Sequence, residues 1–256
     1  MIRENKSILF KYLDINGAKK MLNNSNLQFT NAMRFNDPFD CHPSLIDFSN
    51  VPPERCRGWS PDIIRLLESD RYRRYRENIW ICCLSKLYDS ILMWSYYNQH
   101  KGVCVGLNME KVAKYLHTEY GMLVSPSGLE VQYRDIVEKP NYFQDKENFF
   151  YYQIRMKAKA WEHEQEVRLF ILNPSLCYMA IPDEFNNKNE MPNYNDLRVY
   201  ATIGGECFKE IYLGVNIDKN EKEEIIKLTQ RLNPNIKVYQ MKINPDLFKL
   251  DIIRTK

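Results

Sequence analysis

The stretch from residue 159 to residue 172 constrains the fold most, because charged side chains run there directly into an apolar segment. It reads Lys159-Ala-Trp-Glu-His-Glu-Gln-Glu-Val-Arg-Leu-Phe-Ile-Leu172. Side chains alternate between the two faces of a strand, so a strand over residues 164–172 places Glu164, Glu166 and Arg168 on one face. Charges beside an apolar run are costly to bury unless they are paired. They therefore require a ligand, one another, or water.

Two interpretations of this charged face stay open. The first is a functional site, because ionisable groups beside apolar segments are typical of such sites. The second is a salt-bridged strand face, which contributes only ~0–1 kcal/mol when it is exposed. His163 lies beside the carboxylates in the sequence and could shuttle protons, but on a strand it faces away from them.

Length and composition indicate a globular chain without a membrane span. The 256 residues allow one large domain or two small ones, and 44% apolar with 27% charged residues is ordinary for such a chain. The net charge of +3 argues against a polyanionic partner for the chain as a whole. There is no run of ~18 apolar residues and no apolar signal-peptide core at the N-terminus. We therefore expect a cytoplasmic protein with no membrane partner.

Cysteine usage predicts reduced thiols. None of the seven cysteines has C-x-x-C spacing. Four of them lie in apolar strand-like runs: Cys82, Cys83, Cys104 and Cys207. Buried thiols of this kind fit a reducing compartment. The four histidines are dispersed, so we expect no structural zinc site and no metal.

Hydrophobic periodicity predicts a single α+β domain over residues 1–256, with mixed central sheets and flanking helices. Capping residues such as Asp14, Ser60 and Asp218 mark helix starts. Strands are predicted over 7–12, 27–29, 78–85, 102–108, 128–134, 164–172, 209–215, 236–241 and 248–253. Helices are predicted over 18–22, 60–77, 90–98, 110–117, 145–160 and 219–232. Gly106 inside a strand marks a bulge or a close approach. The asparagine-rich segment 186–195 is expected to be mobile.

The segment Arg34-Phe-Asn-Asp-Pro-Phe-Asp40 predicts a rigid turn. Pro38 restricts the preceding residue to an extended conformation, and Asn36 and Asp37 favour turns in which the side chain bonds to the backbone. Either this is a capped structural turn, or it is a loop that places Asn36, Asp37 or Asp40 at a cleft.

The predicted helix over 60–77 carries arginines interleaved with Tyr72 and Tyr75. Arg71, Arg73 and Arg74 could form a surface for nucleic acid. The alternative is a solvated helix face, and the nearly neutral charge of the whole chain favours it.

Several common catalytic motifs are absent from the sequence: the glycine-rich dinucleotide and P-loops, the His-Glu-x-x-His zinc motif and the Gly-x-Ser-x-Gly elbow. A set of short motifs nevertheless resembles a bacterial family catalogued as domain of unknown function 2971, in collinear order over roughly residues 8–215. The motifs are Phe10-Lys-Tyr12, Phe35-Asn-Asp-Pro-Phe-Asp40, Cys83-Leu-Ser85, Met93-Trp-Ser-Tyr-Tyr97, Lys101-Gly-Val-Cys-Val-Gly106, Val131-Gln-Tyr133 and Lys159-Ala-Trp-Glu-His-Glu-Gln-Glu-Val-Arg168. This resemblance implies family membership and no activity.

The order of features also resembles the ADP-ribosyltransferase fold, which has a split sheet. That fold carries a His or Arg on its first strand, a Ser on a central strand and a catalytic Glu on a late strand. Lys11 or Tyr12 would stand at the first position and Ser85 at the second. Glu164-Gln-Glu166 has the Glu-x-Glu spacing of the arginine-modifying class. The chain departs from the pattern at the first strand, and such a departure often accompanies lost or altered NAD binding.

This resemblance implies NAD as the substrate of a transferase or NAD hydrolase, in a bacterial toxin or phage-defence effector. A carboxylate beside the ribose would stabilise an oxocarbenium-like transition state. Glu166 would hold the ribose, and Glu164 would orient or deprotonate an acceptor. The implied substrate-binding residues are Lys11, Tyr12, Asn36, Asp37, Ser85, Tyr96 and Arg168, with Lys11 or Arg168 at the pyrophosphate and Tyr12 or Tyr96 on the nicotinamide. The alternative is a non-catalytic module that holds a nucleotide, nucleic acid or protein.

Overall fold

The computed structural model describes residues 8–120, 125, 127–173 and 196–255 and confirms the predicted α+β class. The asparagine-rich segment 186–195 lies outside these residues. The helices are α1 (Ile15–Asn24), α2 (Pro61–Glu77), α3 (Ile91–Asn98), α4 (Met109–Tyr120), α5 (Phe149–Arg155) and α6 (Lys219–Leu232). Across the described part of the chain, no helix is long and apolar enough to span a bilayer.

Most strands belong to one large sheet, whose path is β12-β11-β10-β4-β1-β3-β2-β9. The strands are β1 (Ile8–Leu13), β2 (Asn26–Asn31), β3 (Ile79–Ser85), β4 (Val103–Asn108), β5 (Leu129–Glu130), β6 (Gln132–Arg134), β7 (Met156–Ala158), β8 (Glu166–Leu172), β9 (Arg198–Thr202), β10 (Phe208–Leu213), β11 (Lys237–Ile243) and β12 (Leu250–Arg254). Neighbours are antiparallel except β10 and β11, and β6 pairs with β7 separately.

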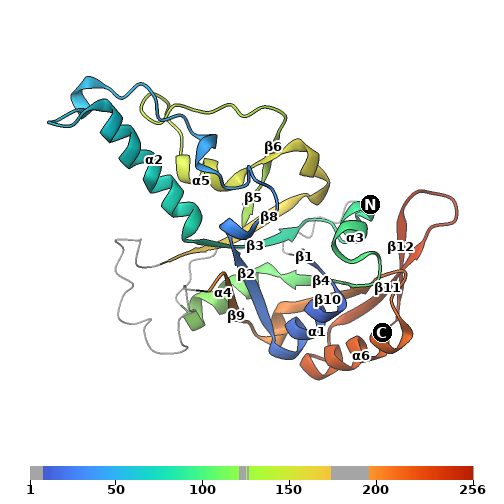
Figure 1. Cartoon of the computed structure of the whole chain (residues 1–256). Coiled ribbons are helices and arrows are strands. Elements are labelled where there is room, and N and C mark those ends of the chain that lie inside the picture. The colour runs from blue at the N-terminus through green and yellow to red at the C-terminus, as the bar shows by residue number, and fades with distance from the viewer. Residues whose placement is uncertain (1–7, 121–124, 126, 174–195, 256) are drawn as a thin grey trace.

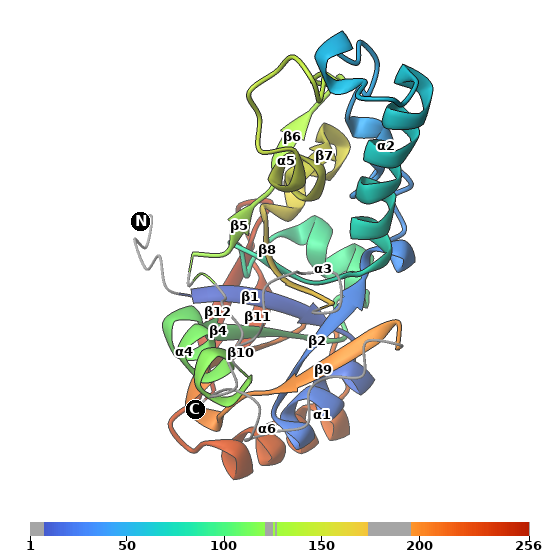
Figure 2. The same cartoon turned by 90° about the vertical axis from the view of Figure 1, so that its left-hand side faces the viewer.

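Strand β3 is the branch point of the sheet. It pairs with β8 along its whole length, from Ile79 to Ser85. A strand has only two edges, and β8 occupies one edge of β3. β1 and β2 therefore both pair with the other edge. β1 meets β3 at Ser85, and β2 meets it at Trp80 and Ile81. The two strands therefore diverge from a common neighbour, and Figure 2 shows β1 and β2 running in different directions.

Helix starts follow the predicted capping residues. The carboxylate of Asp14 accepts a hydrogen bond from the Gly17 amide at 2.6 Å, and the carboxylate of Asp218 accepts one from Asn220 at 2.8 Å. Ser60 begins α2 with Pro61 in its first turn. Such side chains satisfy amides that have no partner within the helix. The predictions that Asp14, Ser60 and Asp218 begin helices are confirmed.

Each face of the large sheet packs against its own hydrophobic core. On one face, apolar side chains of α1, α4 and α6 pack on β1, β4 and β10, with Met21, Leu116 and Ile225 among them. On the other face, Trp94 of α3 lies in an aromatic core with Tyr12 and Tyr212. Because side chains alternate between the two faces of a strand, successive residues of β1 pack alternately into the first core and the second.

A smaller lobe lies beyond β8 in both views, and we call it the upper lobe (Figures 1 and 2). It contains α2, α5, β6, β7 and the loop from residue 35 to residue 60. Its own core is built from Leu45, Ile46, Phe48, Tyr72, Phe149, Tyr152 and Met156. The upper lobe and the large sheet meet at β8, and this junction carries the site described below.

The structure corrects three sequence predictions around that junction. The strand predicted over 164–172 begins at Glu166, because Lys159–Glu164 forms a short 3-10 helix, η4, and Gln165 has a φ of 43°. The helix predicted over 145–160 runs only from Phe149 to Arg155, since Met156–Ala158 pairs with β6. The strand predicted over 128–134 divides into β5 and β6, where the Val131 amide bonds to the Glu166 carbonyl.

Gly106 confirms the prediction of a close approach. A Cβ there would lie 3.1 Å from the Phe10 ring and 3.3 Å from Cβ of Glu210. The opposing strand β10 shifts register between Phe208 and Glu210. A side chain at residue 106 would therefore require the Phe10 ring and Glu210 to shift by a few tenths of an ångström.

Gly102 offers a sharper test of close packing at the start of β4. A Cβ there would lie 2.2 Å from the Leu13 carbonyl oxygen and 2.6 Å from Cβ of Asn98. We expect Gly102→Ala to lower the free energy of unfolding by ~1–3 kcal/mol through overpacking, measured by urea denaturation. The exposed neighbour Lys101 is the control, and Lys101→Ala should stay within ~0.5 kcal/mol of wild type. Equal stability of the two variants would contradict the packing.

Candidate functional site

Arg168 lies at the centre of a buried charged cluster. Its side chain is fully buried. Nη1 and Nη2 donate to the two oxygens of Asp40 at 2.7 and 2.8 Å. Nε donates to Glu166 at 2.8 Å, and Nη1 also donates to the Ile154 carbonyl at 2.8 Å. The planar fork of a guanidinium matches a carboxylate in this two-bond geometry, so the pair is rigid as well as strong.

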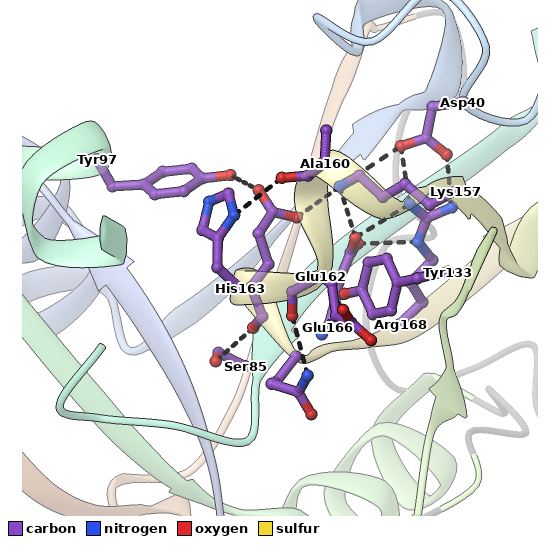
Figure 3. A network of polar contacts seen from close by, with 12 residues as sticks. Asp40, Ser85, Tyr97, Tyr133, Lys157, Ala160, Glu162, His163, Glu166 and Arg168 are labelled. Carbon is purple, nitrogen blue, oxygen red and sulfur yellow. Dashed lines mark hydrogen bonds and ion pairs between the residues drawn. The ribbon is translucent and has the colours of Figure 1, made fainter. Parts of the chain in front are cut away.

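Lys157 of β7 extends this cluster toward η4. Its amine lies 2.5 Å from Glu164, 2.8 Å from Glu166 and 3.9 Å from Asp40. The lysine side chain is only 8% exposed. We call Asp40, Lys157, Glu164, Glu166 and Arg168 the ion network, and Figure 3 shows Asp40, Lys157, Glu166 and Arg168 pointing toward one another.

Three hydroxyl groups surround the ion network (Figure 3). The Tyr97 hydroxyl of α3 donates to the Glu164 carboxylate at 2.5 Å. The Ser85 hydroxyl at the end of β3 donates to the Glu164 carbonyl at 2.7 Å. The Tyr133 hydroxyl accepts from the Glu166 amide at 2.8 Å. These contacts tie both glutamates to three further elements.

The ion network keeps the carboxylate of Glu166 charged. It contains three carboxylates and two cations, which leaves one net negative charge if all are ionised. Burial alone raises the pKa of Glu166, but the charges of Arg168 and Lys157 outweigh it and lower that pKa far below its usual range. Burial lowers the pKa of Lys157, and Glu166 and Glu164 outweigh it and raise that pKa. Glu166 is therefore an ionised carboxylate at any physiological pH.

The ion network reaches the surface on two sides. On one side the Tyr97 side chain is about half exposed, and the ammonium of Lys157 lies 5.2 Å from the centre of the Trp161 ring. On the other side a cavity of about 170 Å³ opens beside Lys157, with Phe39, Ile136 and Met156 in its wall. The acids themselves are nearly fully buried, so a ligand would meet Tyr97 or Lys157 first.

The structure brings four of the predicted site residues together. Glu164, Glu166 and Arg168 share the ion network, although Glu164 comes from η4 and not from the strand. Ser85 is the strand partner of Glu166 across β3 and β8. The alternative of a salt-bridged strand face holds in part, because Glu166 and Arg168 of β8 form an ion pair, although these charges are buried.

The first-strand residues are placed differently from the expected arrangement. The Lys11 amine donates to the Cys83 carbonyl at 2.9 Å and lines a depression whose walls include neither Ser85 nor Glu166. Tyr12 is buried, with its hydroxyl bonded to the Leu87 carbonyl at 3.0 Å. A ring that is packed in the aromatic core is not positioned to stack on nicotinamide.

The turn before Cys41 fits the interpretation of a capped structural turn. Asp37 caps the turn through a 2.9 Å bond from the Phe39 amide, and Asn36 is exposed. Asp40 instead turns inward and joins the ion network. Tyr96 is exposed beside the ring of His163, with 5.7 Å between the ring centres.

The arginine face of α2 is neutralised within the helix. Arg73 and Arg74 lie 2.6 and 2.7 Å from Asp70, and Arg71 lies 3.5 Å from Glu68. Ion pairs at this spacing are typical of a solvated helix face. They favour that interpretation, and nucleic-acid binding through Arg71, Arg73 and Arg74 stays a prediction.

Sequence reasoning missed Lys157, Tyr97 and Tyr133 as members of the site. Lys157 was placed at a helix end, whereas it lies on β7 and points to two glutamates. Tyr97 lies in the helix predicted over 90–98, and its hydroxyl reaches Glu164. The available signal was a charge balance, because two buried acids at 164 and 166 need more than one cation.

Comparisons with known proteins leave the chain without an assigned family. No family model matches it, no curated protein matches it, and no solved structure matches it. The resemblances to domain of unknown function 2971 and to ADP-ribosyltransferases stay predictions. Within the described residues, no group of three or more His, Cys, Asp or Glu side chains is arranged to hold a metal ion.

Removing the central cation should destabilise the protein strongly. Arg168→Ala leaves Asp40 and Glu166 buried with too little compensating charge, and we expect a loss of ~3–5 kcal/mol in unfolding free energy. Arg73→Ala removes an exposed ion-paired arginine and should cost no more than ~1 kcal/mol. Urea denaturation of both variants measures the difference. Similar losses of unfolding free energy would show that the buried pair contributes no more to stability than an exposed one.

The ion network also predicts a direction of pH dependence. Glu166 has a lowered pKa in the fold, so its stabilisation is complete above the ordinary value of 4.5 and is lost as the pH falls below it. Lys157 has a raised pKa in the fold, so its stabilisation is complete below the ordinary value of 10.5 and is lost as the pH rises above that value. Unfolding free energies should therefore fall less between neutral pH and about pH 3 for Glu166→Gln than for wild type. Parallel curves would contradict this assignment.

Proposed function

We propose that this chain is an NAD-using enzyme of the ADP-ribosyltransferase type, acting as a transferase or an NAD hydrolase. The observation that carries the proposal is Glu166, an ionised carboxylate held between Arg168 and Lys157. It lies on the late strand β8, directly opposite Ser85 of β3. A fixed negative charge at such a position suits a reaction whose transition state develops positive charge on a sugar.

The chemistry is the cleavage of the bond between nicotinamide and ribose. The electron pair of that bond leaves with nicotinamide, and positive charge develops at the ribose carbon and its ring oxygen, as in glycoside hydrolysis. Glu166 would stabilise that charge electrostatically. Water or an acceptor hydroxyl or amine would then add to the carbon and release a proton. The Glu164 carboxylate, bonded to the half-exposed Tyr97, would orient the incoming group.

Strand order supports the same proposal. β1, β3 and β8 are consecutive neighbours, with Phe10 opposite Ser85 and Ser85 opposite Glu166. The strands that carry Lys11, Ser85 and Glu166 are therefore neighbours in the sheet, although the side chain of Lys11 lines a different depression. Lys11 meets β3 at the Cys83 carbonyl and does not supply the missing His or Arg. The role of a bacterial toxin or phage-defence effector in the cytoplasm belongs to this proposal.

A second candidate is a non-catalytic nucleotide-binding module. The saturation of Glu166 favours it, because both carboxylate oxygens accept hydrogen bonds from Arg168 and one also accepts from Lys157. A carboxylate satisfied in this way has little capacity left to act on a reacting ribose. The two candidates differ in turnover and not in binding.

Turnover of labelled NAD tests the proposal. The protein is incubated with NAD carrying label in the nicotinamide, alone and with cell extract, and released nicotinamide is measured. We expect wild type to release it and Glu166→Gln to be slower by about 10²–10³-fold, which is the usual loss when one group that stabilises transition-state charge is removed. Glu162→Gln changes an exposed acid of η4, the 3-10 helix that precedes β8, and should retain the wild-type rate.

Tyr97→Phe keeps the proposal testable if Glu166→Gln does not fold. It removes the hydroxyl by which the half-exposed Tyr97 bonds to Glu164 and should slow the release while leaving the fold intact. Binding of NAD without release by the folded wild type would favour the non-catalytic module. Release at the same rate by all variants would reject Glu166 as the reacting carboxylate.

A further inference from the structure

A second depression lies where β1 and β2 diverge from β3. Its volume is about 330 Å³, and its walls come from the end of β1, the first turns of α1, and the strands β2 and β9. The divergence follows from the shared edge of β3, since β1 takes Ser85 and β2 takes Trp80 and Ile81. Between these points the Cys83 carbonyl has the amine of Lys11 as its partner, at 2.9 Å.

The depression is positively charged. Lys11, Lys20 and Arg198 line it, and Asp14 is the acid among its lining residues. The Asp14 carboxylate already accepts a hydrogen bond from the Gly17 amide as the cap of α1. Three cations against one acid leave an excess of two positive charges in a space of ligand size.

These cations have no acid of their own in the part of the chain that the structure describes. None of Lys11, Lys20 and Arg198 forms an ion pair there. The adjacent Lys19 on the same helix behaves differently, because it lies 2.5 Å from Glu221 and 2.7 Å from Glu224. Lys11 is also half-buried. Its ammonium group has three N–H donors, and only one of them bonds to the Cys83 carbonyl. Partial burial of a cation without a counterion favours an anionic ligand.

Strands β2 and β9 add a polar and aromatic wall. Gln28 is the strand partner of Tyr200, and the tyrosine hydroxyl donates to the Gln28 amide oxygen at 3.2 Å. Tyr200 is half exposed, and Arg198 lies two residues before it on the same face of β9. A flat ring beside a guanidinium suits a base and a phosphate group at the same time.

We propose that this depression binds a nucleoside diphosphate, with its phosphates at Lys11, Lys20 and Arg198 and its base against Tyr200. The volume is within the usual range of small-molecule sites, ~300–1,000 Å³. Arginine holds phosphate oxygens through two parallel bonds, and the lysines act as point charges. This site is separate from Glu166, which is not among its lining residues, and it does not depend on NAD cleavage.

Calorimetric titration with ADP tests the proposal, with adenosine as the matched ligand that lacks phosphate. We expect ADP to bind at least tenfold more tightly than adenosine, since one charge-assisted contact alone corresponds to about that factor. The double variant Lys20→Gln with Arg198→Gln should lose at least tenfold in ADP affinity and little in adenosine affinity. Lys19→Gln removes a neighbouring charge of α1 that is paired with Glu221 and is not among the lining residues, and this variant should bind ADP as wild type does.

Three results would overturn the proposal: equal affinity for ADP and adenosine, ADP binding that the double variant leaves unchanged, or an equal loss in Lys19→Gln. Raised salt should weaken the binding of ADP and leave that of adenosine unchanged, because exposed charges are screened. Glu166→Gln should bind ADP normally, and the double variant should release nicotinamide at the wild-type rate. The two proposals can therefore fail independently.

Discussion

The structure depends most on the buried pair between Arg168 and Asp40, which joins two segments far apart in the sequence. All five N–H groups of the guanidinium have acceptors, divided among Asp40, Glu166 and the Ile154 carbonyl. An arginine buried without them would carry an uncompensated charge in the interior. The loop that carries Asp40 must therefore dock on β8, and with it the upper lobe takes its place on the large sheet.

The same ion network connects the upper lobe to the large sheet and is also the candidate site. Replacing a buried ion network with apolar side chains of similar volume is often neutral or even stabilising, so stability alone is a weak reason for its presence. Its excess of negative charge and its link through Glu164 to the half-exposed Tyr97 are features that a purely structural joint does not need. They are the physical basis for assigning it a role in the chemistry of a positively charged transition state.

Local features of the fold were predictable, and the site was predictable only in part. The helix over 219–232 was predicted with its observed bounds, because Asp218 caps its start and Pro234 follows its end. The spacing of Glu166 and Arg168 indicated a shared face, which β8 confirms. Lys157 escaped the same reasoning. The aromatic run before it resembles a helix, whereas pairing with β6 makes residues 156–158 a strand, and local propensity cannot register a distant partner.

The sequence by itself determined the α+β class, the principal helix starts and the charged content of the segment 164–168, because caps and periodicity act over a few residues. Only the tertiary structure decided which charges meet. Asp40, Lys157 and Arg168 converge because β8 pairs with β3 while β7 pairs with β6. It also separated Lys11 from Glu166, since β1 leaves the edge of β3 after Ser85. Contacts over such sequence distances depend on strand pairing, which no local pattern encodes.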